Sequence, residues 1–181
     1  MRDWLWLEDQ PGTVGDMGLY LTKIGIRYNS YQTPNELINF LCKIKKEEVP
    51  DILNNYGLIL DVLLMGNRYI TCPPEWSGGQ KTNFFPTDKS GYDGGIAFYE
   101  RIILGMGIKD SPIWNPPPPV LFLTVLKQGD ENIEQRVETI KEKWAIAACD
   151  GFIDRAKVAW LGKWDANEKK LREIFKGWGE I

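Results

Sequence analysis

The sequence predicts an α/β protein with a doubly wound, five-stranded parallel sheet and helices on both faces. Short apolar runs alternate with longer amphipathic segments along the chain, which is typical of strands and helices that take turns around a parallel sheet. Three of the short runs are almost wholly apolar, as strands covered on both faces must be. The chain has 181 residues, of which 43% are hydrophobic, enough for one substantial core. We therefore expect a single domain over residues 1–181.

Five strands are expected from these runs. They cover residues 4–7, 27–31, 58–63, 120–125 and 157–161. Right-handed crossovers between successive parallel strands would place the intervening helices on both faces of the sheet.

The first two helices differ in their signals. The first, at about residues 14–24, contains Gly15 and Gly18, which lower its helix propensity. The second opens with Thr33-Pro34-Asn35-Glu36, a capping box with proline at the first helical position.

Two helices are expected in the second half of the chain. Asp130 can cap a helix that presents apolar residues on one face, namely Ile133, Val137, Ile140 and Trp144. Asp165, followed three residues later by Glu168, is expected to open the last helix. The buried side of that helix would carry Leu171, Ile174, Phe175 and Trp178.

Two stretches do not fit the alternation. Residues 66–92 are rich in glycine, proline and aromatic residues without a clean period, so we expect a long excursion after the third strand. Residues 113–119 contain four consecutive prolines, which favour an extended polyproline segment leading into the fourth strand.

The composition excludes several function classes. The chain contains no histidine, so it cannot by itself build a Ser-His-Asp or Cys-His catalytic site or a histidine metal site. Its 22 basic and 25 acidic residues give a net charge of −3, which offers no footprint for nucleic acid or anionic lipid. Cys42, Cys72 and Cys149 are an odd number with no metal-ligand spacing, and neither a signal peptide nor a membrane span is evident. We expect a cytoplasmic protein.

Polar residues follow the predicted strands at the point where each strand ends. Glu8 and Asp9 follow the first strand, Asp61 lies in the third, Thr124 in the fourth, and Lys163 follows the fifth. The carboxyl ends of parallel strands meet at one edge, so these groups should converge there. Clustered carboxylates repel one another unless a hard cation such as Mg²⁺ lies among them, and an aspartate can act as a nucleophile towards phosphorus.

These strand ends resemble the receiver domain of two-component response regulators, a flavodoxin-like fold. The matching segments are Trp4-Leu5-Trp6-Leu7-Glu8-Asp9, Leu58-Ile59-Leu60-Asp61-Val62-Leu63-Leu64, Asp93-Gly94 at the start of the third helix, Val120-Leu121-Phe122-Leu123-Thr124 and Trp160-Leu161-Gly162-Lys163. The resemblance implies the strand order 2-1-3-4-5. It covers nearly the whole chain except the two excursions.

The resemblance also implies a function and roles for individual residues. Asp61 would accept a phosphoryl group from a histidine kinase or phosphotransfer protein. Asp9, Asp61 and the backbone carbonyl of Leu63 would bind Mg²⁺, with Glu8 acting through water. Thr124 and Lys163 would contact the phosphoryl group, and Trp160 would be the aromatic side chain that responds to Thr124.

We therefore expect a stand-alone receiver, not a true enzyme, that signals to an unknown output protein as a monomer or homodimer, with no output domain, no nucleic acid and no membrane. One alternative is a receiver-like interaction scaffold that does not use phosphate. It is motivated by Val125, where receivers usually have a small residue, and by the 66–92 insertion. A less favoured alternative is a small phosphohydrolase with Asp61 as nucleophile. No second acidic residue stands two positions after Asp61 to serve as its general acid.

Overall fold

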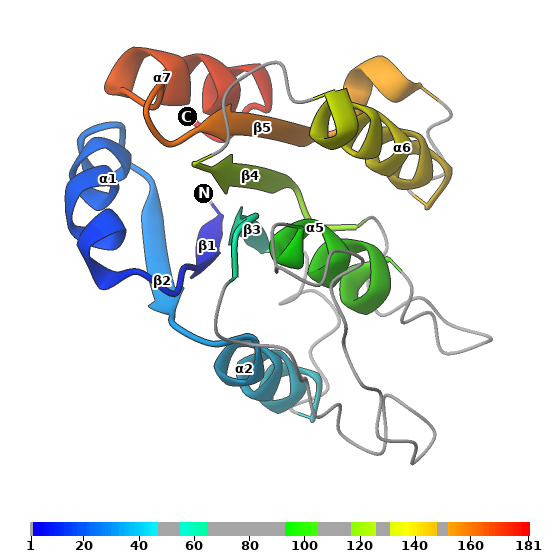
Figure 1. Ribbon diagram of the computed structural model, residues 1–181, viewed down its shortest axis with the longest axis horizontal. Helices are drawn as coiled ribbons and strands as arrows, with labels where there is room; N and C mark the ends of the chain where they lie inside the picture. The colour runs from blue at the N-terminus through cyan, green and yellow to red at the C-terminus, as the bar shows by residue number, and fades with distance from the viewer. Residues whose placement is uncertain (1, 47–54, 65–92, 105–116, 126–130, 148–151) are drawn as a thin grey trace.

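The computed structural model contains one five-stranded parallel sheet (Figure 1). The structure describes residues 2–46, 55–64, 93–104, 117–125, 131–147 and 152–181. The strands are β1 (Asp3–Leu7), β2 (Arg27–Tyr31), β3 (Tyr56–Asp61), β4 (Val120–Thr124) and β5 (Val158–Gly162). They lie in the order β2-β1-β3-β4-β5, and all four neighbouring pairs are parallel. The predicted fold class and strand order are confirmed.

The third strand differs from the prediction at both of its ends. It begins at Tyr56 and ends at Asp61, whereas the prediction continued it to Leu63. The Val62 N–H still donates to Leu123 O of β4 at 2.8 Å, but the next N–H, that of Leu63, donates to Asp61 Oδ1 at 3.1 Å, a local bond of the kind that competes with strand pairing. Asp61 is therefore the last residue of its strand rather than an interior one.

Helices cover both faces of the sheet (Figure 1). On one face, α1 (Pro11–Lys23) and α7 (Glu168–Gly177) pack on Trp4, Trp6 and Ile59. On the other face lie α2 (Pro34–Lys46), α5 (Gly94–Phe98) with its π-helical continuation η1 (Tyr99–Ile103), and α6 (Glu131–Ala147). This second face has the larger core, which includes Leu58, Leu60 and Phe122.

Of the helix starts predicted at α2 and α7, the one at α2 is confirmed and the one at α7 is wrong. At α2 the capping box is formed as expected: Thr33 Oγ1 accepts from Glu36 N at 3.2 Å, and Glu36 Oε2 accepts from Thr33 N at 3.3 Å. At α7 the prediction of Asp165 as the cap is wrong. The cap is Asn167, whose side chain accepts from Lys170 N. The Asp165 N–H instead donates to Gly162 O, which closes the turn after β5 and delays the helix.

Aromatic residues join the first strand to the last helix. Trp4 lies against Gly57 of β3, where a Cβ atom would clash with the indole ring. The Trp4 ring meets Phe175 edge-on at 4.7 Å and stacks on Trp178 at 5.9 Å with an interplanar angle of 13°. Burial of these large rings secures α7 to the sheet. Gly18 of α1 serves a similar packing purpose, because the Tyr28 hydroxyl occupies the space a side chain would need.

The edge of the sheet where the strands begin carries a small ion cluster. The Glu180 side chain is buried, and its Oε1 lies 3.1 Å from Lys157 Nζ and 3.3 Å from Arg2 Nε. Arg2 also donates to Tyr56 O at 3.4 Å. We call Arg2, Lys157 and Glu180 the amino-edge cluster.

Several sequence predictions lie outside the described residues. These are the 66–92 excursion, most of the 113–119 polyproline segment, and the Asp130 cap. No helix within the described ranges is both long enough and apolar enough to cross a membrane.

Candidate functional site

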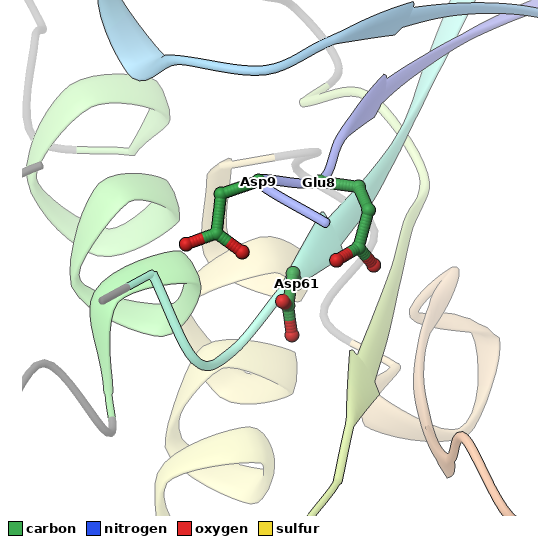
Figure 2. A group of neighbouring side chains, drawn as sticks. All are labelled: Glu8, Asp9 and Asp61. Atoms are coloured by element: carbon green, nitrogen blue, oxygen red, sulfur yellow. The ribbon is translucent and has the colours of Figure 1, made fainter. Parts of the chain in front are cut away.

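Three carboxylates meet at the edge of the sheet where the strands end. Glu8 and Asp9 directly follow β1, and Asp61 ends the neighbouring strand β3. One oxygen from each residue lies within 4.8 Å of the other two. In Figure 2 the carboxylates of Glu8 and Asp9 lie on either side of Asp61, and all three extend to the same side of the strand ends. The predicted convergence of these residues is therefore seen in the structure.

Lys163 reaches the carboxylates from the end of the edge strand β5, which is separated from β3 by β4. It follows β5, and its Nζ lies 2.8 Å from Glu8 Oε2 and 2.8 Å from Asp61 Oδ2. It also donates a hydrogen bond to Glu8 Oε1 at 3.0 Å. The Lys163 side chain is 7% exposed, and those of Glu8 and Asp61 are fully buried. We call Glu8, Asp9, Asp61 and Lys163 the carboxyl-edge site.

Backbone groups fix the orientation of two of the carboxylates. Asp61 Oδ1 accepts from the Leu63 N–H at 3.1 Å, so its other oxygen, Oδ2, is turned towards Lys163. Glu8 Oε1 accepts from the Gln10 N–H at 3.2 Å. These bonds hold the side chains in place before any ligand arrives, which is what a pre-organised site requires.

The surroundings of Asp61 favour its neutral form. Burial is the main cause, and it raises the pKa of Asp61 from its ordinary value of 3.8 to about 7. Repulsion from Glu8 adds to the rise, whereas the Lys163 ammonium and the Leu63 N–H oppose it. A cation that came close to Asp61 would reverse this effect and favour the carboxylate.

The donor set fits a hard divalent cation. Two buried carboxylates, those of Glu8 and Asp61, contact the single ammonium of Lys163, and an oxygen of Asp9 lies within 4.8 Å of both. Within the described part of the chain, the buried oxygens Glu8 Oε2 and Asp61 Oδ2 accept no well-aligned hydrogen bond, although each lies close to Lys163 Nζ. All-oxygen ligands of this kind suit Mg²⁺, which one or two carboxylates commonly hold together with waters.

The other predicted site residues lie around this cluster. Thr124 is fully buried at the end of β4, and its carbonyl accepts from the Lys163 N–H at 2.6 Å. Leu63 follows Asp61 in the turn after β3. Trp160 lies on β5 beside Phe122, and its partly buried ring packs against the core beneath α5 and α6. The structure thus brings Lys163 into contact with the carboxylates, and Thr124 next to Lys163 through the backbone.

A glycine pair fits the next helix closely against this edge. A Cβ atom on Gly95 would clash with the carbonyl oxygen of Asp61, and one on Gly94 would come within 2.8 Å of Leu64 Cβ. The Gly95 N–H also donates to Val62 O at 3.2 Å. The expected start of a helix at Asp93-Gly94 is therefore seen, with Asp93 as its N-cap. The two glycines allow α5 to approach the backbone at the end of β3 closely.

Sequence reasoning missed the arginine behind this junction. Arg136 of α6 reaches Asp93 with one guanidinium nitrogen and Glu100 with another. The one signal available in the sequence is that Arg136 precedes a buried position of an amphipathic helix, which does not identify a partner 43 residues away.

No protein-family model matches the chain, and no curated protein sequence matches it. The solved structures similar to it include the following two. One is a fusion carrying a yeast Spc42 trimeric coiled-coil segment, with 16% identity, a TM-score of 0.48, and coverage of 98% of this chain and 79% of that chain. The other is a response regulator receiver protein from Burkholderia phymatum, with 15% identity, a TM-score of 0.46, and coverage of 99% and 98%. At these values neither likeness carries an argument about function, which must come from the site itself.

Proposed function

We propose that this chain is a response-regulator receiver that accepts a phosphoryl group on Asp61 in the presence of Mg²⁺. The observation that supports the proposal most strongly is the carboxyl-edge site: three converging carboxylates with a buried lysine on the central one. The flavodoxin-like strand order places this site at the carboxyl ends of β1 and β3, where ligands of such sheets bind.

The chemistry is a transfer between two molecules. A carboxylate oxygen of Asp61 attacks phosphorus in the phosphohistidine of a histidine kinase or phosphotransfer protein. A P–O bond forms as the P–N bond breaks, and the imidazole leaves with the bonding electron pair. The chain has no histidine, so the donor must belong to a partner or to a small phosphodonor.

Each residue of the site has a proposed part in that step. Asp9, Asp61 and the Leu63 carbonyl would hold Mg²⁺, with Glu8 acting through water. When bound, the ion neutralises charge on the transferring phosphoryl oxygens. Lys163 would leave its contact with Asp61 Oδ2 to bind a phosphoryl oxygen, and the Thr124 hydroxyl would bind another.

The signal would follow from the added charge. A phosphoryl group on Asp61 would draw Thr124 and Lys163 towards it. Trp160, which lies on the edge strand β5 three residues before Lys163, would then change its packing. The surface formed by α6, β5 and α7 would then be presented differently to an output protein. We propose a cytoplasmic protein that acts as a monomer or homodimer and binds neither nucleic acid nor membrane.

Mass spectrometry of the intact chain tests the acceptor. Incubation with Mg²⁺ and acetyl phosphate should add one phosphoryl group to the wild type and none to Asp61→Asn. Asp165→Asn removes a half-exposed aspartate in the turn after β5, so it should be phosphorylated like the wild type. A wild type that gains no adduct from any phosphodonor would favour the scaffold function, and turnover of phosphomonoesters would favour a hydrolase.

Calorimetric titration with Mg²⁺ tests the metal ligands. Asp9→Ala should weaken binding more than about tenfold, since even outer-shell partners change metal affinity by that much. Asp16→Ala removes an exposed aspartate of α1 and should leave the affinity unchanged. Equal affinities for the wild type and Asp9→Ala would sink the assignment of Asp9.

A further inference from the structure

We propose that Arg136 of α6 is a positioning residue for the carboxyl-edge site: by clamping Asp93 and Glu100 it holds α5 against the turn after β3 and thereby sets the affinity for Mg²⁺. The inference rests on the proposed function, since it concerns the same cation site. It assigns a role to a residue of α6, a helix that contributes no residue to the carboxyl-edge site.

The clamp is a two-armed ion pair inside the helix layer. Arg136 Nη1 lies 2.6 Å from Asp93 Oδ2, and Nη2 lies 2.9 Å from Glu100 Oε2. The Arg136 side chain is 19% exposed, and those of Asp93 and Glu100 are 9% and 18% exposed. Charge-assisted bonds that are so little exposed to water are stronger and more rigid than surface pairs.

One acceptor, Asp93, lies at the start of α5 as its N-cap residue, and the other, Glu100, lies in its continuation η1, where the helix widens into a π-turn. Because the guanidinium is planar and binds both carboxylates at once, it fixes the helix in rotation as well as in position. Local π-turns are frequent at functional sites, and here one places Glu100 within reach of α6.

The start of α5 is in turn pressed onto the site. Gly95 lies so close to the Asp61 carbonyl that a Cβ atom would not fit, and its N–H donates to Val62 O at 3.2 Å. Gly94 packs in the same way against Leu64. Leu63 lies between Val62 and Leu64, which α5 contacts on either side of it. The position of the Leu63 carbonyl, the proposed backbone ligand for Mg²⁺, therefore depends on the position of α5.

These contacts form a continuous route from α6 to the cation site. It runs from Arg136 through Asp93 and the glycine pair to the turn at Leu63. Any change in cation binding that moves this turn is therefore linked to the position of α6, and the linkage acts equally in both directions. The route differs from the one proposed through Thr124 and Trp160, because it leaves the site at β3 rather than at β4 and β5.

Three variants test the role of Arg136, with Mg²⁺ affinity measured by calorimetry and amide hydrogen exchange measured without metal. Arg136→Ala should weaken Mg²⁺ binding by about tenfold, the range expected for an outer-shell partner. It should also speed exchange at the Gly95 amide. Arg136→Lys keeps the charge but loses the fork, so its affinity should lie between those of Arg136→Ala and the wild type. Arg172→Ala breaks an exposed pair with Glu168 on α7 and should match the wild type in both measurements.

The outcomes separate this inference from the proposed function. If the wild type binds Mg²⁺ and both Arg136 variants bind it equally well, the positioning role is wrong while the receiver proposal stands. If the wild type binds no Mg²⁺, the proposed function fails and the inference fails with it. Should Arg136→Ala not fold, Arg136→Lys and Glu100→Gln decide the matter, and wild-type affinity in both would overturn the inference.

Discussion

The two edges of the sheet bury charge in opposite ways. At the amino edge one buried carboxylate, Glu180, is contacted by two cations, Arg2 and Lys157. At the carboxyl edge two fully buried carboxylates, those of Glu8 and Asp61, share the ammonium of Lys163, and an Asp9 oxygen lies within 4.8 Å of theirs. The first cluster is rich in positive charge and joins the end of the chain to the starts of two strands. Among the residues that the structure describes, the second buries two carboxylates against one cation.

The difference is the one expected between a structural ion cluster and the cation site proposed above. A buried charge is costly unless it is paired, and at the amino edge the one buried charge, that of Glu180, is paired with two cations that remain partly exposed to water. Two fully buried carboxylates that share one cation are instead typical of a functional site that a ligand completes. Removing a carboxylate should therefore weaken the amino edge and stabilise the metal-free carboxyl edge.

The largest expected effect is a pH dependence that belongs to the carboxyl edge alone. Folding raises the pKa of Asp61 from 3.8 to about 7, so between these values the folded protein holds a proton that the unfolded chain has released. In EDTA, the free energy of unfolding should therefore fall as pH rises through this window, by up to about 1.4 kcal/mol per pH unit. The loss is complete above about pH 7.

Urea unfolding at several pH values from 4.5 to 8 measures this effect as the difference between wild type and Asp61→Asn. The variant lacks the titrating group, so it should be the more stable of the two at pH 8, by about 2 kcal/mol or more. A wild type that gains stability relative to the variant as pH rises would contradict the assigned pKa direction.

Adding Mg²⁺ should offset the cost of burying the carboxylates at the carboxyl edge and so raise the stability of the wild type. At a concentration about 100 times its dissociation constant, the ion should stabilise the wild type by about 2.7 kcal/mol. Thermal unfolding at pH 8 with and without Mg²⁺ checks this. Asp61→Asn should gain much less, and Glu180→Gln should gain as much as the wild type, because its change lies at the far edge. Equal gains in Asp61→Asn would place the cation elsewhere.

Breaking the amino-edge cluster should lower the free energy of unfolding, whereas Asp61→Asn at the carboxyl edge should raise it in the absence of metal. Glu180→Gln leaves Arg2 and Lys157 without their shared carboxylate and should destabilise the protein by about 2 kcal/mol, less than a fully buried pair because both cations are partly exposed. Glu168→Gln, which breaks an exposed i,i+4 pair on α7, should change stability by no more than about 0.5 kcal/mol. If the two variants unfold alike, the amino-edge cluster contributes no more than a surface pair.

The smallest effect concerns one glycine at each edge. Gly95→Ala forces a methyl group against the Asp61 carbonyl and should destabilise the protein by about 1 kcal/mol or more. Gly177→Ala, at the end of α7 with open space around it, should be neutral or stabilising by up to about 1 kcal/mol. Chemical unfolding of both variants measures the difference, and a stable Gly95→Ala protein would show that α5 can move away from β3.

Much of the sheet and its site could be predicted from the sequence. Buried parallel strands are short apolar runs, and the carboxyl ends of such strands share one edge, so Glu8 and Lys163 could be brought together although 155 residues separate them. The end of β3 could not be placed in the same way. Val62 and Leu63 continue the apolar run, and the sequence gives no sign that the Leu63 N–H bonds the Asp61 side chain where the strand ends.

Other features depend on packing that leaves no local pattern. Asp165 and Asn167 are both good helix caps, and the turn at Gly162 decides between them. The Arg136 clamp joins helices that are distant in the sequence, and the amino-edge cluster requires the end of α7 to reach the starts of β1 and β5. Charged residues at such positions look like ordinary solvent-facing residues until the helices are docked.

The stacked indoles of Trp4 and Trp178 also have an optical consequence. Two indole rings held 5.9 Å apart couple their electronic transitions, and a paired positive and negative band in circular dichroism is expected where the transition moments are rotated relative to each other within the stack. One ring belongs to the first strand and the other caps the last helix, so the band pair exists only while α7 is docked on the sheet. The native chain thus contains its own spectroscopic reporter of whether its two ends are together.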